Sequence, residues 1–300
     1  MNLIQKLVFP LVLAGGLTSA HAESDAAADA RQATFAAAAR AAESAQVAGP
    51  ADVDLLDQGK LHLPEGELWI PKSEAANLLR AMGNTVDERL VGLVLPQGDG
   101  NWMVVAKFEK AGYVKDDDAR DWKADELLDG LKKGTEASNE DRRTRGFPEL
   151  LIDGWVQAPK YDSSTHRLVW SIKAHNKGAE AQGASINYNT YALGRDGYFS
   201  LNLVTDLGSI DTNKQIAHGL LAALDYRDGK RYADFNASSD KVAEYGLAAL
   251  VGGLAAKKLG FFALAAGLFA KFFKVIALAG VAVIAGVSRF FKRGKNSETA

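Results

Sequence analysis

The chain has 300 residues, of which 47% are hydrophobic and 24% charged, values that are ordinary for a folded protein. It contains no cysteine, which excludes disulfides, thiolate metal sites and a thiol nucleophile. Residues 1–244 hold 27 basic and 36 acidic residues and so carry a net charge of −9, whereas residues 245–297 hold eight basic residues and no acidic ones. The acidic body is a poor partner for nucleic acid, and the basic end suits an anionic membrane surface.

The N-terminal segment is expected to deliver the protein rather than to form its folded body. A basic start, an apolar core at residues 7–17 and the small-x-small pattern Ala20-His21-Ala22 predict a secretory signal peptide over residues 1–22. An uncleaved signal anchor is the alternative. Residues 23–49 are rich in alanine, which favours helix, but they contain little large apolar surface. We therefore expect a frayed helix or a linker there.

A second membrane signal lies near the C-terminus. Residues 272–291 are apolar and would form a helix about 30 Å long, which matches the hydrocarbon core of a bilayer. Basic residues flank this predicted transmembrane helix: Lys271, Lys274, Arg289, Lys292, Arg293 and Lys295. The positive-inside rule places the basic tail, residues 292–300, in the cytoplasm. We expect a single-pass protein of a bacterial inner membrane, with its domain in the periplasm and the lipid bilayer as a partner.

The apolar run before this span is expected to lie at the membrane surface. Lys257 and Lys258 stand near its middle, and each would cost about 2.5–3.5 kcal/mol at the centre of a bilayer. We therefore predict an amphipathic, interfacial helix over residues 242–271, and helical structure that starts just before it, near Ser239 or Asp240. A two-helix membrane hairpin is the alternative.

Residues 50–241 are expected to form an α+β domain, with a mainly antiparallel sheet and covering helices. Its first half predicts a hairpin over 61–71, a helix over 72–82, a hairpin of strands 89–96 and 102–109, and a helix over 121–143. Its second half predicts strands over 150–158, 167–175, 185–193 and 198–205, a helix over 212–225 and an extended segment over 229–235. Gly154–Val204 has the longest two-residue alternation, so we expect it to be the central sheet, with one apolar and one polar face.

Several runs of the sequence carry a family resemblance, among them GYVKDDDARDW, GFPELLIDGW, NYNTYALGRDGYFSLNLVTD and AAKKLG. Over roughly residues 50–290 the chain resembles a bacterial family catalogued as domain of unknown function 2167 and described as membrane-anchored. The resemblance implies a signal peptide, an exported domain and a C-terminal anchor. It implies no activity and no catalytic residues.

No catalytic or metal-binding motif is recognisable in the sequence. The GxSxG, P-loop, dinucleotide-binding and HExxH patterns do not occur, and no histidine has a ligand-like pairing with an acid. We therefore expect no metal and no cofactor. The run Asp116-Asp117-Asp118 fails as a calcium loop, because the required glycine and glutamate do not stand at their places. A solvated turn is the expectation there.

The best polar constellation lies around two predicted turns. Asp162 and His166 could act as base and orienter, or His166 as an acid, in a glycan or ester hydrolase. The candidate binding residues are Asn187, Asn189, Arg195 and Asp196. Roles in turns and on a polar strand face are the competing interpretation, which we favour because Asp and Ser start turns by bonding their own backbone. A second patch, residues 230–234, could face lipid headgroups or close the sheet edge.

The sequence thus favours a non-enzymatic binding or scaffold module of the cell envelope, with another envelope protein or an envelope component as its partner. Two alternatives stay open. One is a membrane-tethered periplasmic hydrolase that uses Asp162 and His166. The other is an accessory subunit of an inner-membrane complex that acts through residues 245–291.

Overall fold

The computed structural model describes residues 23–252, with the exception of residues 83, 85, 121, 145–147 and 179–184. The predicted signal peptide, the predicted transmembrane helix with its flanking basic residues, the tail and most of the predicted amphipathic helix lie outside these residues. Within the described part of the chain, no helix has both the length and the apolar character that a bilayer span requires.

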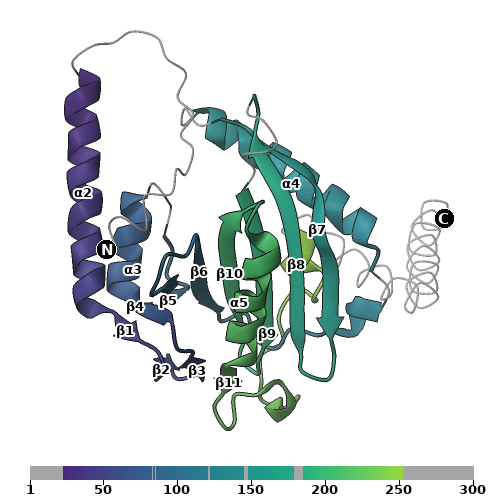
Figure 1. Ribbon diagram of the computed structural model, residues 1–300. Helices are drawn as coiled ribbons and strands as arrows, with labels where there is room; N and C mark the ends of the chain where they lie inside the picture. Colours follow the sequence, from purple (N-terminus) through teal and green to yellow (C-terminus); the bar gives the residue numbers. More distant parts are fainter. Residues whose placement is uncertain are drawn as a thin grey trace, which may run out of the picture.

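One large antiparallel sheet organises the molecule (Figure 1). Its eight strands lie in the order β1-β4-β5-β6-β10-β9-β8-β7, and every neighbouring pair is antiparallel. The strands are β1 (Val47–Ala48), β4 (Glu67–Pro71), β5 (Leu90–Pro96), β6 (Trp102–Glu109), β7 (Leu150–Asp162), β8 (Arg167–Asn176), β9 (Ser185–Leu193) and β10 (Tyr198–Asp206). The predicted α+β class with a large antiparallel sheet is confirmed. The alternating stretch supplies the half of the sheet from β10 to the edge strand β7.

A small second sheet has the order β11-β3-β2. Its strands are β2 (Ala51–Leu55), β3 (Gly59–Leu63) and β11 (Leu224–Tyr226). The hairpin predicted over residues 61–71 is therefore wrong as a pairing, because β3 and β4 follow each other in the chain but belong to different sheets. Strand β4 already pairs with β1 on one side and β5 on the other, so neither of its edges is open to β3.

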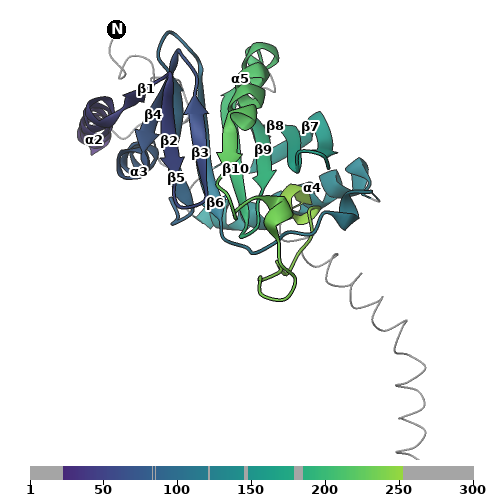
Figure 2. The ribbon, with the colours of Figure 1, turned by 90° about the horizontal axis from the view of Figure 1, so that it is seen from below.

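Helices cover both faces of the large sheet (Figure 2). Helix α3 (Lys72–Ala81) packs on β4 and β5, and α4 (Ala124–Thr144) packs on β7. Helix α5 (Ile210–Ala222) packs on β9 and β10. Successive cross-strand partners point to one side of a sheet, and here they run Trp170, Asn189, Asn202, Val105 and Leu93.

This side, which packs under α4 at Trp170 and under α3 at Leu93, is called the α3/α4 face below. The opposite side, the α5 face, carries the largest apolar cluster of the molecule. It joins the large sheet to α5 and to the small sheet through residues such as Leu61, Phe199 and Leu220. The predicted helices over 72–82 and 121–143, and the hairpins β5/β6, β7/β8 and β9/β10, are confirmed.

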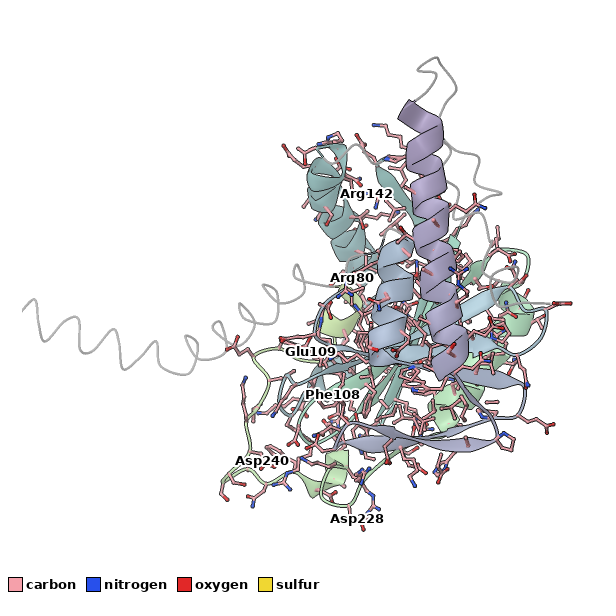
Figure 3. All side chains as sticks on the ribbon, turned by 90° about the vertical axis from the view of Figure 1, so that its left-hand side faces the viewer. Arg80, Phe108, Glu109, Arg142, Asp228 and Asp240 are labelled. Carbon is pink, nitrogen blue, oxygen red and sulfur yellow. The ribbon has the colours of Figure 1, made fainter. Side chains whose placement is uncertain are left out.

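The alanine-rich N-terminal segment forms helix α2 (Glu23–Ala45), which lies beside α3 (Figures 1 and 3). Its last turns bury Ala38, Ala39 and Ala42 in the cluster that also holds Leu78. We expected a frayed helix or a linker because the segment has few large apolar side chains. Small side chains nevertheless let the two helices approach closely, and Phe35 of α2 also packs against this cluster.

Boundaries differ from the predicted ones at two places. Strand β7 continues to Asp162, so the turn before β8 is shorter than expected. Residues 229–235 are not simply extended, because they include a 3-10 turn, η3 (Tyr232–Asp234).

The helix predicted to begin near Ser239 or Asp240 does not begin there, since helical structure starts at Ala249. Val242 instead forms an isolated bridge with Tyr113, which holds the preceding chain extended.

Candidate ligand-binding pocket

Two apolar clusters on the α3/α4 face leave a polar gap between them. The first cluster lies under α2 and α3 and includes Leu79 and Met103. The second lies under α4 and includes Leu127 and Trp170. Between them, strands β6, β10 and β9 present polar side chains to a cavity of about 280 Å³. The gap is therefore built into the middle of the sheet, where three paired strands form its floor.

Strand pairing brings the polar side chains of this floor together. Asn202 on β10 is the cross-strand partner of Asn189 on β9. Ser200 is the partner of Lys107 on β6 and of Tyr191 on β9. Because directly opposite residues have Cβ atoms about 4.5–5.5 Å apart, these side chains form one continuous patch. Apolar residues also line the cavity: Leu79, Val86, Leu90, Val105, Leu201 and Val204.

The amide groups of the pocket are not fully hydrogen-bonded. Oδ1 of Asn202 is buried and has no hydrogen-bond partner among the described residues. Asn189 is only 8% exposed, and its Nδ2 donates to the backbone oxygen of Asn187 over a long 3.3 Å. Leaving a buried acceptor unpaired costs about 1–3 kcal/mol. Asn202 is therefore a place where a donor from a bound molecule would be stabilising.

The charges next to the pocket compensate one another. Nζ of Lys107 lies 3.2 Å from Oδ2 of Asp87, and Arg89 pairs with both Asp87 and Glu109. The hydrogen bonds from Arg89 and Lys107 hold the pKa of Asp87 well below its usual range, so this carboxylate stays charged. Two cations thus face two carboxylates, and no described residue that lines the cavity is acidic.

An aromatic group borders the pocket at Tyr191. Its ring stacks with that of Trp170 at a centroid distance of 6.5 Å and meets the ring of Tyr198 edge-on at 5.8 Å. Burial raises the pKa of Tyr191, so its hydroxyl stays protonated at neutral pH. The pocket therefore combines amides, hydroxyls and an apolar wall.

The structure separates the four predicted binding residues into two places. Asn187 and Asn189 line the pocket, but Arg195 and Asp196 lie in the β9/β10 turn. Arg195 donates to Asp240 through Nε at 2.7 Å and Nη2 at 2.8 Å. Asp196 accepts from Nζ of Lys230 at 2.6 Å. These bonds fasten the turn to the segment that follows β11.

Asp162 and His166 do not share a hydrogen bond among the contacts of the described residues. The carboxylate of Asp162 accepts from the N–H and hydroxyl of Ser164 and from the hydroxyl of Thr165, which lowers its pKa to about 2. His166 stacks on Tyr232 with ring centroids 4.1 Å apart. Asp162 therefore serves the turn, as the competing interpretation of the sequence expected.

His166 has two other neighbours. The hydroxyl of Tyr161 donates to Oδ2 of Asp116 at 2.7 Å and lies 3.1 Å from Nδ1 of His166. A hydroxyl has one hydrogen, so Nδ1 of His166 is the donor in the second bond. The prediction of a solvated turn at Asp116–Asp118 is therefore wrong for Asp116, whose carboxylate is hydrogen-bonded to Tyr161. The prediction is also wrong for Asp118, because its carboxylate accepts hydrogen bonds from the N–H groups of Leu247 and Ala248, each at 3.0 Å.

Other predicted polar groups have structural partners. The second patch lies at the end of the interior strand β9 and not at a sheet edge, since Arg231 bridges Gly194 and the hydroxyl of Tyr232 donates to the backbone oxygen of Val114. His62 and His175 do meet acids, Asp52 and Asp153, although the sequence showed no such pairing. The described part of the chain holds no group of three or more His, Asp or Glu side chains that could bind a metal ion.

Sequence reasoning missed Lys107, Ser200 and Asn202 as pocket residues. The alternation in YFSLNLV did place Ser200 and Asn202 on a polar strand face. The pattern does not indicate that β10 pairs with both β6 and β9. This pairing puts Ser200 and Asn202 in the middle of the sheet.

A sequence comparison now adds to this geometry. The model of a family described as protein of unknown function DUF2167 matches residues 47–283. The chain belongs to the DUF2167 family. The match covers all strands of both sheets and every residue of the pocket. No match was found among curated proteins.

Two solved structures are distantly similar to this DUF2167 protein. The solution structure of cyanobacterial PsbP (CyanoP) from Synechocystis sp. PCC 6803 has 9% identity and a TM-score of 0.37, over 61% of this chain and 91% of that one. The Saccharomyces cerevisiae Ran-binding protein Mog1p has 11% identity and a TM-score of 0.32, over 58% of this chain and 94% of that one.

Proposed function

We propose that this protein is a non-enzymatic binding module of the bacterial cell envelope, tethered to the inner membrane, and that the pocket on the α3/α4 face holds its ligand. The observation that carries the proposal is Asn202, which lines the cavity and whose buried Oδ1 has no hydrogen-bond partner among the described residues. A buried acceptor without a partner is destabilising in the free protein and becomes favourable once a ligand donates to it. The basic and apolar C-terminal sequence supports the tether.

The geometry around His166 supports binding over hydrolysis. A base needs an orienting partner and a place for the reacting atom. Asp162, the partner expected from the sequence, is engaged by Ser164 and Thr165, and the face of the imidazole is covered by Tyr232. The role as accessory subunit rests on residues 245–291, most of which lie outside the described residues.

Filling the pocket tests the proposal. The full-length protein would be purified from membranes, and its mass measured under native conditions for a bound small molecule. Ser200→Phe places a bulky ring on the floor of the cavity, so we expect the bound mass in the wild-type protein and its loss in the variant. Asn77→Leu, on the exposed side of α3, is the matched control and should keep the ligand. An identical mass for the wild type and Ser200→Phe would refute the pocket as a ligand site.

A further inference from the structure

We infer that the pocket on the α3/α4 face takes a neutral saccharide, whose hydroxyl groups bond to Asn189, Ser200 and Asn202. This inference rests on the function proposed above and names the chemical class of the ligand. It is carried by the amide and hydroxyl lining, the compensated charges and the central position of the strands.

The hydrogen-bonding groups of the pocket complement hydroxyls. An asparagine side chain offers an N–H donor and a carbonyl acceptor side by side, and a serine hydroxyl offers both in one atom. A sugar hydroxyl likewise donates and accepts, so neighbouring hydroxyls on a ring can match Asn189 and Asn202, which are direct cross-strand partners. The unpaired Oδ1 of Asn202 requires a donor, which every hydroxyl supplies.

The charges next to the pocket favour a ligand without net charge. Lys107 is the lining residue with a formal charge among those described, and its ammonium group faces Asp87. An anionic ligand would have to compete with Asp87 for Lys107. A cationic ligand would find no carboxylate in the described lining. Burying an uncompensated charge is costly, so a neutral molecule is the best match.

The remaining lining fits the apolar faces of a sugar ring. Val105 and Val204 stand on the sheet floor, and Leu79 and Leu90 belong to the cluster under α3. Carbon–hydrogen faces of a pyranose can pack on these side chains while its hydroxyl rim meets the amides. The volume of about 280 Å³ lies just below the range of pockets for drug-sized ligands, which suits one or two rings.

The strand arrangement argues against an extended peptide. Peptide recognition by strand addition needs an open sheet edge with free N–H and C=O groups. Strands β6, β10 and β9 are each paired on both sides, so their backbone groups are already used in the ladder. Only side chains are left to recognise a ligand at this place. Hydroxyls suit that mode of recognition better than a main chain does.

The test is a titration of the full-length protein in a detergent without a sugar headgroup. The probes are glucose, glucosamine and glucuronate, which share a ring but are neutral, cationic and anionic. Dissociation constants would be measured by ligand-observed NMR. We expect glucose to bind the wild-type protein more tightly than either charged sugar.

Two substitutions of Asn202 test whether its side-chain amide binds the sugar. Asn202→Leu removes the acceptor and should weaken glucose binding about tenfold. Asn202→Asp keeps an oxygen acceptor but adds a negative charge, so it should shift the preference from glucose to glucosamine. Asn77→Leu should bind glucose as the wild-type protein does. Thermal unfolding of each variant would verify that it is folded.

The outcomes separate this inference from the proposed function. Tighter binding of a charged sugar to the wild type, or unchanged binding in Asn202→Leu, would overturn the saccharide. If a bound mass is lost in Ser200→Phe but no sugar binds, the pocket is a ligand site and the saccharide inference fails. If the wild type has neither a bound mass nor affinity for a sugar, both fail.

Discussion

At the scale of single residues, two buried carboxyl or amide oxygens without partners mark different things. Asn202 lines a cavity, so the missing partner of its buried Oδ1 points to a ligand. Oε2 of Glu67 is buried at the start of β4, and Glu67 is not among the residues that line that cavity. Burial raises the pKa of Glu67 to about 7. This burial could not be predicted, because Glu67 follows a Pro-Glu-Gly turn and resembles an ordinary exposed turn residue.

The raised pKa of Glu67 predicts that stability falls as the pH rises. The folded protein keeps the proton up to about pH 7, whereas the unfolded chain releases it near the ordinary glutamate pKa of 4.5. The unfolded state therefore binds fewer protons between these values, and the free energy of unfolding decreases by up to about 3 kcal/mol. Glu67→Gln should remove this decrease. Urea unfolding of both proteins at pH 5 and pH 8 measures it, and equal pH dependence would contradict the prediction.

At the scale of elements, local pattern predicted which segments are strands and hairpin length predicted which of them pair. The β9/β10 hairpin follows from alternation and a Gly-Arg-Asp-Gly turn. In this turn, a Cβ on Gly197 would overlap the backbone oxygen of Glu109. The separation of β3 from β4 could not be predicted, because partner choice depends on β1 and β5, which are distant in sequence or too short to show a pattern.

The same element yields a prediction about the Arg195–Asp240 pair. Asp240 also accepts from the N–H of Asn236 at 2.7 Å, so this carboxylate joins the turn to the chain beyond β11. Asp228 lies at the same end of the molecule and pairs with Arg231, but its side chain is 91% exposed (Figure 3). Asp240→Ala should therefore lower the Tm clearly more than Asp228→Ala. Calorimetry decides this, and similar Tm values for the two variants would show that the turn needs no such fastening.

At the scale of the whole molecule, the pocket exists because two helical clusters cover one sheet face incompletely. The polar floor of the sheet was visible in the sequence as Asn187 and Asn189. The walls of the pocket come from Leu79 of α3 and from the chain that follows it, including Val86 and Leu90, which lie about a hundred residues away along the chain. Binary patterning indicates which strand face is polar. It does not indicate whether water, a helix or a cavity lies over that face.

The contact between Asp118 and the C-terminal segment predicts how that segment is held. Asp118→Ala removes an acceptor for two N–H groups, so we expect a loss of about 1–3 kcal/mol and faster amide exchange at Leu247 and Ala248. Asp117→Ala, at the exposed neighbouring position, is the control. Hydrogen exchange followed by mass spectrometry resolves this segment. Unchanged exchange in Asp118→Ala would show that side-chain burial alone holds it.

The docking of that segment has a mechanical consequence. The cluster under α4 buries Leu247, Leu250 and Val251 with Leu168 and Trp170 of β8. In the same segment, the carboxylate of Asp118 accepts the hydrogen bonds from the N–H groups of Leu247 and Ala248. A pulling force applied beyond Gly252 would therefore act on residues that are packed and hydrogen-bonded to the domain. It would be transmitted to β8, whose neighbour β9 forms part of the pocket floor. We therefore expect the domain and residues 247–252 to respond to such a force as one rigid unit.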